Sequence, residues 1–142
     1  MVMRGSDGTF VENRWDGKDL GHTRILLVED DPKAREILSW LLVMQGAEVL
    51  GVASVEEALG AFETFAPHVL VSDLNLADAT GFDLVGELRG RGAEIPAIAI
   101  SSELGDGLEV LARGFQMGLR KPVSSDELTD AVGRLTAHRH GA

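Results

Sequence analysis

The sequence predicts an α/β fold in which five parallel strands alternate with five helices in a doubly wound sandwich. Two observations predict it. Short runs of aliphatic and β-branched residues recur along the chain, and between them lie segments whose apolar residues are spaced by three and four positions. Short connections rich in Gly, Pro, Ser and Asp join these segments.

The first half of this pattern begins at Ile25. Residues 25–28 form the first expected strand, and Asp31 and Pro32 start a helix as N-cap and first-turn proline. Residues 47–52 form the second strand. Ser54 with Glu57 three residues later is typical of a capping box at the next helix start. The third strand covers residues 69–72.

The second half repeats the alternation. A third helix opens at Gly81, and the fourth strand covers residues 97–100. A weak, glycine-containing fourth helix is expected over about 106–113, and a very short strand at 119–120. The last helix is expected to have Ser125 as its N-cap.

Length and composition indicate one domain. The chain has 142 residues, 44% of them hydrophobic, which suffices for one packed core. We expect a flexible leader over residues 1–23, the domain over 24–137 and a frayed tail over 138–142, in which metal chelation by the two histidines is the less favoured interpretation. The residues after the last helix are too few for an effector domain, so we expect none.

Charge and cysteine content exclude several functions. The formal net charge of −10 opposes binding to polyanions, so we expect no direct contact with nucleic acid. The absence of cysteine excludes disulfides, thiolate zinc sites and a cysteine nucleophile. No segment is long and apolar enough for membrane insertion or a signal peptide, so we expect a cytoplasmic protein.

Polar residues stand where the expected strands end. Glu29 and Asp30 follow the first strand, Asp73 the third, Ser101 the fourth and Lys121 the fifth. The carboxyl ends of parallel strands lie along one edge of a sheet, where ligands bind. Carboxylates, a hydroxyl and an ammonium group together suit a divalent cation and a phosphoryl group. Each residue alone would more simply be a cap or a solvated turn residue.

Taken together, these motifs identify a family resemblance. Residues 24–137 resemble CheY-like receiver domains of response regulators. The motifs that carry this resemblance are Val28–Asp31, Ser72–Leu76, Ile100–Ser102 and Arg120–Pro122. The resemblance implies a flavodoxin-like sheet with strand order 2-1-3-4-5. It also implies a phosphoacceptor domain of a histidine-to-aspartate phosphorelay. The donor would be a sensor histidine kinase or a histidine phosphotransfer protein.

The resemblance also implies a role for each residue of the site. Asp73 would be the phosphoacceptor. Asp30, Asp73 and the backbone carbonyl of Asn75 would ligate Mg²⁺ directly, and Glu29 through water. Ser101 and Lys121 would bind the phosphoryl group, and the Lys121–Pro122 peptide bond would be cis. The protein would catalyse only its own phosphorylation and dephosphorylation.

Two positions depart from the family pattern. Ala77 stands where the loop after the phosphoacceptor usually has proline, and Gly118 stands where the fifth strand usually has an aromatic residue or histidine. Residues 114–123 are most similar to receivers attached to hybrid histidine kinases. The resemblance places the downstream partner on the face of the fourth helix, fifth strand and fifth helix. We expect Phe115 or Met117 to fill the space beside Ser101.

Three other functions differ from this interpretation in the residues that they need. A haloacid-dehalogenase-type phosphatase needs a second aspartate two residues after the nucleophile, where this chain has Asn75. A Rossmann nucleotide site needs a glycine-rich turn where this chain has three acidic residues. A receiver fold used as an interaction module without phosphorylation stays the serious alternative.

Overall fold

The computed structural model describes residues 19–137. The five strands are β1 (Arg24–Val28), β2 (Glu48–Val52), β3 (Val69–Asp73), β4 (Ala97–Ser101) and β5 (Met117–Arg120). The five helices are α1 (Pro32–Met44), α2 (Val55–Phe65), α3 (Gly81–Gly90), α4 (Leu108–Ala112) and α5 (Ser125–Leu135). All pairs of strands are parallel, in the order β2-β1-β3-β4-β5, which confirms the predicted fold and topology.

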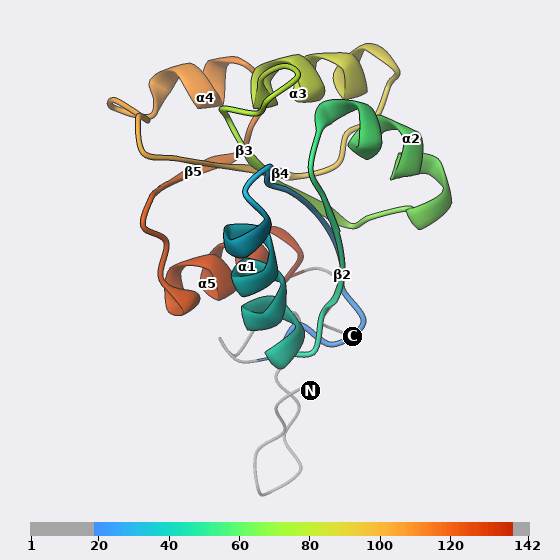
Figure 1. Cartoon of the computed structure of the whole chain (residues 1–142), viewed down its shortest axis with the longest axis vertical. Helices are drawn as coiled ribbons and strands as arrows, with labels where there is room; N and C mark the ends of the chain where they lie inside the picture. Colours follow the sequence, from blue (N-terminus) through green and yellow to red (C-terminus); the bar gives the residue numbers. More distant parts are fainter. Residues whose placement is uncertain (1–18, 138–142) are drawn as a thin grey trace, which may run out of the picture.

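The helices cover both faces of the sheet. Helices α1 and α5 lie on one face, and α2, α3 and α4 lie on the other (Figure 1). Each face has its own apolar core, one around Leu42, Ile98 and Val132, the other around Leu26, Leu84 and Phe115. Because both faces are covered, β3 and β4 are buried along their whole length. Their sequences are accordingly apolar at successive positions up to the polar residues at their carboxyl ends.

The segment just before β1 is part of the packed domain. Leu20 is fully buried in the α1/α5 core, and its backbone N–H donates to the carbonyl of Gln45 at 2.7 Å. The flexible leader expected over residues 1–23 therefore ends too late in the sequence, because residues 19–23 pack on the domain. The leader over residues 1–18 and the tail over 138–142 lie outside the described residues and stay predictions.

Most of the expected helix starts are confirmed, with two differences in detail. Asp31 caps α1 and accepts a hydrogen bond from the N–H of Ala34 at 3.0 Å. Ser54 caps α2, but Glu57 bonds the N–H of Ala53 instead of that of Ser54. Helix α5 has Ser124 as its N-cap, so the expectation for Ser125 is wrong by one residue.

Helix α4 and strand β5 also differ in length from the prediction. Helix α4 has only five residues, and it begins later than expected because Gly107 before it has a left-handed backbone with φ of 81°. Strand β5 begins at Met117, two residues earlier than expected, because it pairs with β4 from Ile98 onward. Within residues 19–137, no helix is long and apolar enough to cross a bilayer.

Candidate functional site

The ends of four strands bring the predicted residues together. Val28 is paired with Ser72, Asp73 with Ile100, and Ser101 with Arg120 across neighbouring strands. Glu29 follows β1 and Lys121 follows β5, so both continue from the same edge of the sheet as Asp73. This edge is the position predicted from the strand ends.

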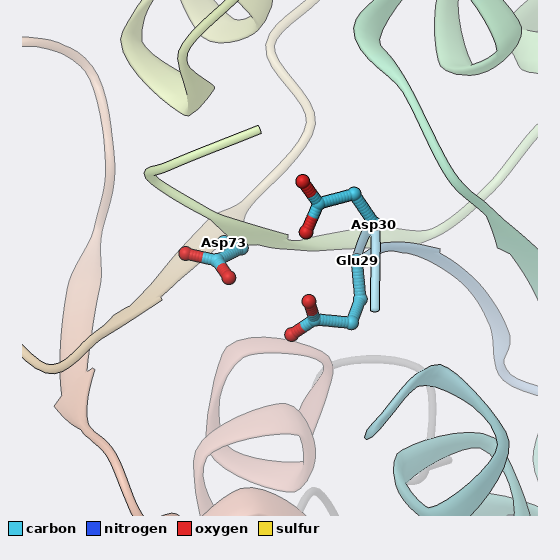
Figure 2. A group of neighbouring side chains, drawn as sticks. All are labelled: Glu29, Asp30 and Asp73. Carbon is cyan, nitrogen blue, oxygen red and sulfur yellow. The ribbon is translucent and has the colours of Figure 1, made fainter. Parts of the chain in front are cut away.

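Three carboxylates form a cluster at this edge. Figure 2 shows Glu29 and Asp30 extending their carboxylates toward the side on which Asp73 lies. One oxygen from each of the three residues lies within 4.8 Å of the others. Glu29 and Asp73 are buried, with 1% and 6% of their surface exposed, whereas Asp30 is half-buried. The Asp30 carboxylate accepts no hydrogen bond and forms no ion pair within residues 19–137. Closely spaced carboxylate oxygens, one of them without a partner, fit the ligand preference of Mg²⁺.

The ammonium group of Lys121 joins two of these carboxylates. Its Nζ atom lies 2.6 Å from Oδ2 of Asp73 and 2.9 Å from Oε1 of Glu29. The Lys121–Pro122 peptide bond is cis, as predicted. The other oxygen of Glu29 accepts a hydrogen bond from the N–H of Asp31 at 3.1 Å. Lys121 therefore neutralises part of the negative charge that the cluster concentrates.

Burial and charge change the pKa values of this ion pair. Burial raises the pKa of Glu29, against the opposing effect of the hydrogen bond from Lys121. Burial alone would lower the pKa of Lys121, but its hydrogen bonds to Asp73 and Glu29 outweigh this and raise it. Lys121 is consequently charged throughout the physiological range.

Ser101 lies buried at the end of β4. Its Oγ atom accepts a hydrogen bond from the backbone N–H of Glu103 at 3.0 Å. Because this bond uses the oxygen as an acceptor, the hydroxyl proton can be donated to another group, such as a phosphoryl oxygen. The predicted hydroxyl position is therefore occupied by a group with the required chemistry.

The loop after β3 is fixed in place by Asn75 and Asp78. The N–H of Asn75 donates to Oδ1 of Asp73 at 3.0 Å. The two carboxylate oxygens of Asp78 accept from the N–H groups of Val55 and Glu56, both at 3.1 Å, at the start of α2. The hydrogen bond from Val55 is the largest of the contributions that lower the pKa of Asp78. This anchor was missed in the sequence, and it holds the loop in which Ala77 replaces the usual proline.

The space beside Gly118 is filled by residues other than those expected. A Cβ atom at position 118 would lie 3.1 Å from Val110 and 3.2 Å from Leu104. A cavity of about 120 Å³ lies next to Leu104 and is also lined by Ser101 and Asn75. Leu104 and Val110 thus occupy the place that the expectation assigned to two other residues.

Both residues named in that expectation lie elsewhere. The ring of Phe115 packs edge-on against Phe82, with 6.0 Å between ring centres. Met117 packs against the core on the α1/α5 side of the sheet. Met117 points to the opposite face of the sheet from Gly118, because alternate residues of a strand do so. Phe115 precedes β5, and Leu104 and Val110 already fill the space beside Gly118.

Comparison with known proteins identifies relatives over most of the chain. Residues 25–133 match the family model described as the response regulator receiver domain. A protein from Leptolyngbya boryana, described as an uncharacterized 14.6 kDa protein in the sodA1 3′ region, is 37% identical over 80% of this chain and 89% of its own length. The response regulator protein FleR of Pseudomonas aeruginosa is 33% identical over 78% of this chain.

FleR is much longer than the matched region, which is 24% of its length. Among solved structures, the CheY-like response regulator receiver domain from Methylobacillus flagellatus superposes with a TM-score of 0.73. It is 30% identical to this chain and covers 81% of this chain and 99% of its own. The receiver domain of the Francisella response regulator 1452 superposes with a TM-score of 0.78, at 27% identity, over 83% and 98% of the two chains.

Proposed function

Because the chain belongs to the response regulator receiver domain family, we propose that its acidic site takes up a phosphoryl group on Asp73 in the presence of Mg²⁺. The family places the domain in two-component signalling. The position of Lys121 between Asp73 and Glu29 is the observation that carries the proposal, because it pairs a buried carboxylate with a cation from another strand.

The geometry supports a simple transfer reaction. An oxygen of Asp73 would attack the phosphorus atom of a phosphohistidine, so that a P–O bond forms while the P–N bond breaks and its electrons leave with the imidazole. Lys121 would turn from the carboxylate to the incoming phosphoryl oxygens, and the Ser101 hydroxyl would donate to one of them. Lys121 already lies beside Asp73, and such positioning of charge is the main requirement for a reaction with a loose transition state.

The carboxylates of Asp30 and Asp73 and the backbone carbonyl of Asn75 would hold the metal directly, and the carboxylate of Glu29 would hold it through water. A bound Mg²⁺ ion supplies positive charge that offsets the negative charge of the transferred group. Water would later hydrolyse the acyl phosphate and reset the domain. The protein therefore acts only on itself, and its product is a conformational state.

The partners follow from the same proposal. The donor would be a sensor histidine kinase or a histidine phosphotransfer protein, in the cytoplasm. The downstream protein would bind the face formed by α4, β5 and α5. The loop that follows Ser101 connects the site to α4, the first element of this face. The similarity of residues 114–123 to receivers of hybrid histidine kinases supports the proposal that this domain works within, or beside, such a kinase.

The alternative is an interaction module that uses the same fold without phosphorylation. The glycine at position 118 favours it mildly, since the usual aromatic residue is absent. The complete set of acceptor residues favours phosphorylation, because an interaction surface needs none of these buried charges.

Phosphorylation by acetyl phosphate with Mg²⁺ tests the proposal directly. We expect intact-mass analysis to show one added phosphoryl group, which borohydride reduction and peptide mapping place on Asp73. Asp73→Asn should abolish the label, and Asp106→Asn, an exposed aspartate outside the cluster, should leave it unchanged. A label of equal stoichiometry on Asp73→Asn would overturn the assignment.

A further inference from the structure

Helix α1 exposes an apolar face. Ile37, Trp40, Val43 and Met44 are each at least half exposed, and they account for four of the six large hydrophobic side chains that are exposed in residues 19–137. Their spacing places them on one contiguous side of the helix, next to the buried side that carries Leu38. Single exposed hydrophobic residues are ordinary on protein surfaces, but a contiguous group on one helix indicates a contact surface.

The first described residues, Asp19 and Leu20, lie beside the C-terminal end of this same helix. The N–H of Leu20 donates to the carbonyl of Gln45, which directly follows α1. A Cβ atom on Gly46 would lie 3.3 Å from the carboxylate of Asp19. The 18 residues that precede Asp19 are therefore attached beside the C-terminal end of the apolar face.

These 18 residues carry apolar groups at suitable spacing. Phe10, Val11 and Trp15 are the large apolar residues closest to the attachment point. Trp15 is four residues before Asp19, so it can reach about 13 Å from it. Trp40 lies about 7 Å along the helix axis from Gln45. The distance is therefore within the reach of the attached segment.

We propose that residues 1–18 bind the apolar face of α1 formed by Ile37, Trp40, Val43 and Met44. The attachment makes this contact intramolecular. A short tether gives a local concentration in the millimolar range, so even weak apolar contacts keep the face covered. The net charge of residues 1–18 is zero, with three acidic and three basic side chains, so no repulsion by the acidic domain opposes the contact.

Fluorescence quenching tests the proposal in the full chain. The protein has two tryptophans, Trp15 and Trp40, so Trp15→Phe leaves Trp40 as the only reporter and retains an aromatic ring at position 15. The test variant is Phe10→Asp with Trp15→Asp. The matched control carries Trp15→Phe with Thr9→Asp and Asn13→Asp, which add the same charge at polar positions.

We expect acrylamide to quench Trp40 about twofold more strongly in the test variant than in the other two proteins, the change expected if most molecules hold the segment on α1. Equal quenching in all three proteins would overturn the proposal and leave the face open to another partner. Protection of Trp40 that disappears on dilution, together with a doubled mass by light scattering, would instead identify a second copy as the occupant and also overturn it. The measurement involves no phosphoryl group or metal, so it is independent of the proposed function.

Discussion

Leu104 lies against Gly118, with both of its methyl carbons within 3.3 Å of the position that a Cβ atom on residue 118 would take. It is the residue after Glu103, whose N–H is bonded to the Ser101 hydroxyl oxygen. A movement of Ser101 toward a phosphoryl group would therefore pull on the segment that carries Leu104. Leu104 and Val110 together fill the space beside Gly118, where the resemblance to receivers led us to expect an aromatic residue.

The first prediction concerns this route from the site. Beryllofluoride with Mg²⁺, a mimic of the phosphoryl group, should protect residues 102–115 from hydrogen exchange. Leu104→Ala should remove this protection, and it should lower stability by about 1–2 kcal/mol, less than for a fully buried leucine. Leu111→Ala, on the exposed side of α4, is the control and should retain the protection. Protection around Asp73 with none over residues 102–115 would contradict the prediction.

The second prediction concerns the carboxylate cluster. Three like charges within 4.8 Å destabilise the protein when no cation is bound, so Mg²⁺ should raise the melting temperature by several degrees at saturating concentration. Asp30→Asn should weaken this response and raise the melting temperature in the absence of metal. Asp31→Asn removes the same charge one residue away and keeps a good N-cap, so it should preserve most of the response. A melting temperature that does not change in millimolar Mg²⁺ would show that the cluster is not a metal site.

The third prediction uses the lowered pKa of Asp78. A carboxylate with a lowered pKa in the folded state contributes stability above its unfolded pKa of about 4, and this stability is lost as the pH falls through the folded value. Asp78→Asn should therefore lower the melting temperature at pH 7, and its difference from the parent protein should shrink below about pH 4. Glu63→Gln, an exposed change of equal charge on α2, should show no such loss. A difference that is constant with pH would rule out the carboxylate as its cause.

The fourth prediction compares two buried threonines near the end of the chain. The hydroxyl of Thr129 is buried with no hydrogen-bond partner in residues 19–137, whereas that of Thr136 donates to the carbonyl of Val132 at 2.7 Å. Thr129→Val should therefore stabilise the protein by about 1 kcal/mol, and Thr136→Val should destabilise it by a similar amount. Denaturant titration of both variants measures the difference. Equal effects of the two changes would contradict this account of the Thr129 hydroxyl.

Most of the site could be predicted from the sequence, because each of its residues directly follows an apolar run. Once β1, β3, β4 and β5 are parallel, the residues at their ends must lie along one edge, and the sequence order identifies them. The N-cap of α5 could also have been found. Ser124 has Glu127 three residues later and Ser125 has Leu128, so the capping-box pattern favours Ser124.

Contacts between loops could not be predicted in this way. Asp78 bonds Val55 and Glu56, 23 and 22 residues earlier, and no local pattern marks such a pair. The position of Leu104 beside Gly118 depends on how the loop before α4 folds over the sheet. The burial of Leu20 depends on contacts with α1 across a turn. In each case tertiary packing decides the position, and periodicity within one element says nothing about it.

The pairing of Glu29 with Lys121 joins residues that are 92 positions apart in the chain. During synthesis, the first acidic residues leave the ribosome long before the lysine that neutralises them, and β5 is added to the sheet only near the end. A nascent or truncated chain without this strand lacks the Lys121 ammonium group, so Glu29 and Asp73 have no counter-charge from it, even where β1 and β3 have already paired. Under the proposed function, such an incomplete chain would not accept a phosphoryl group, and only a domain folded through β5 would carry the signal.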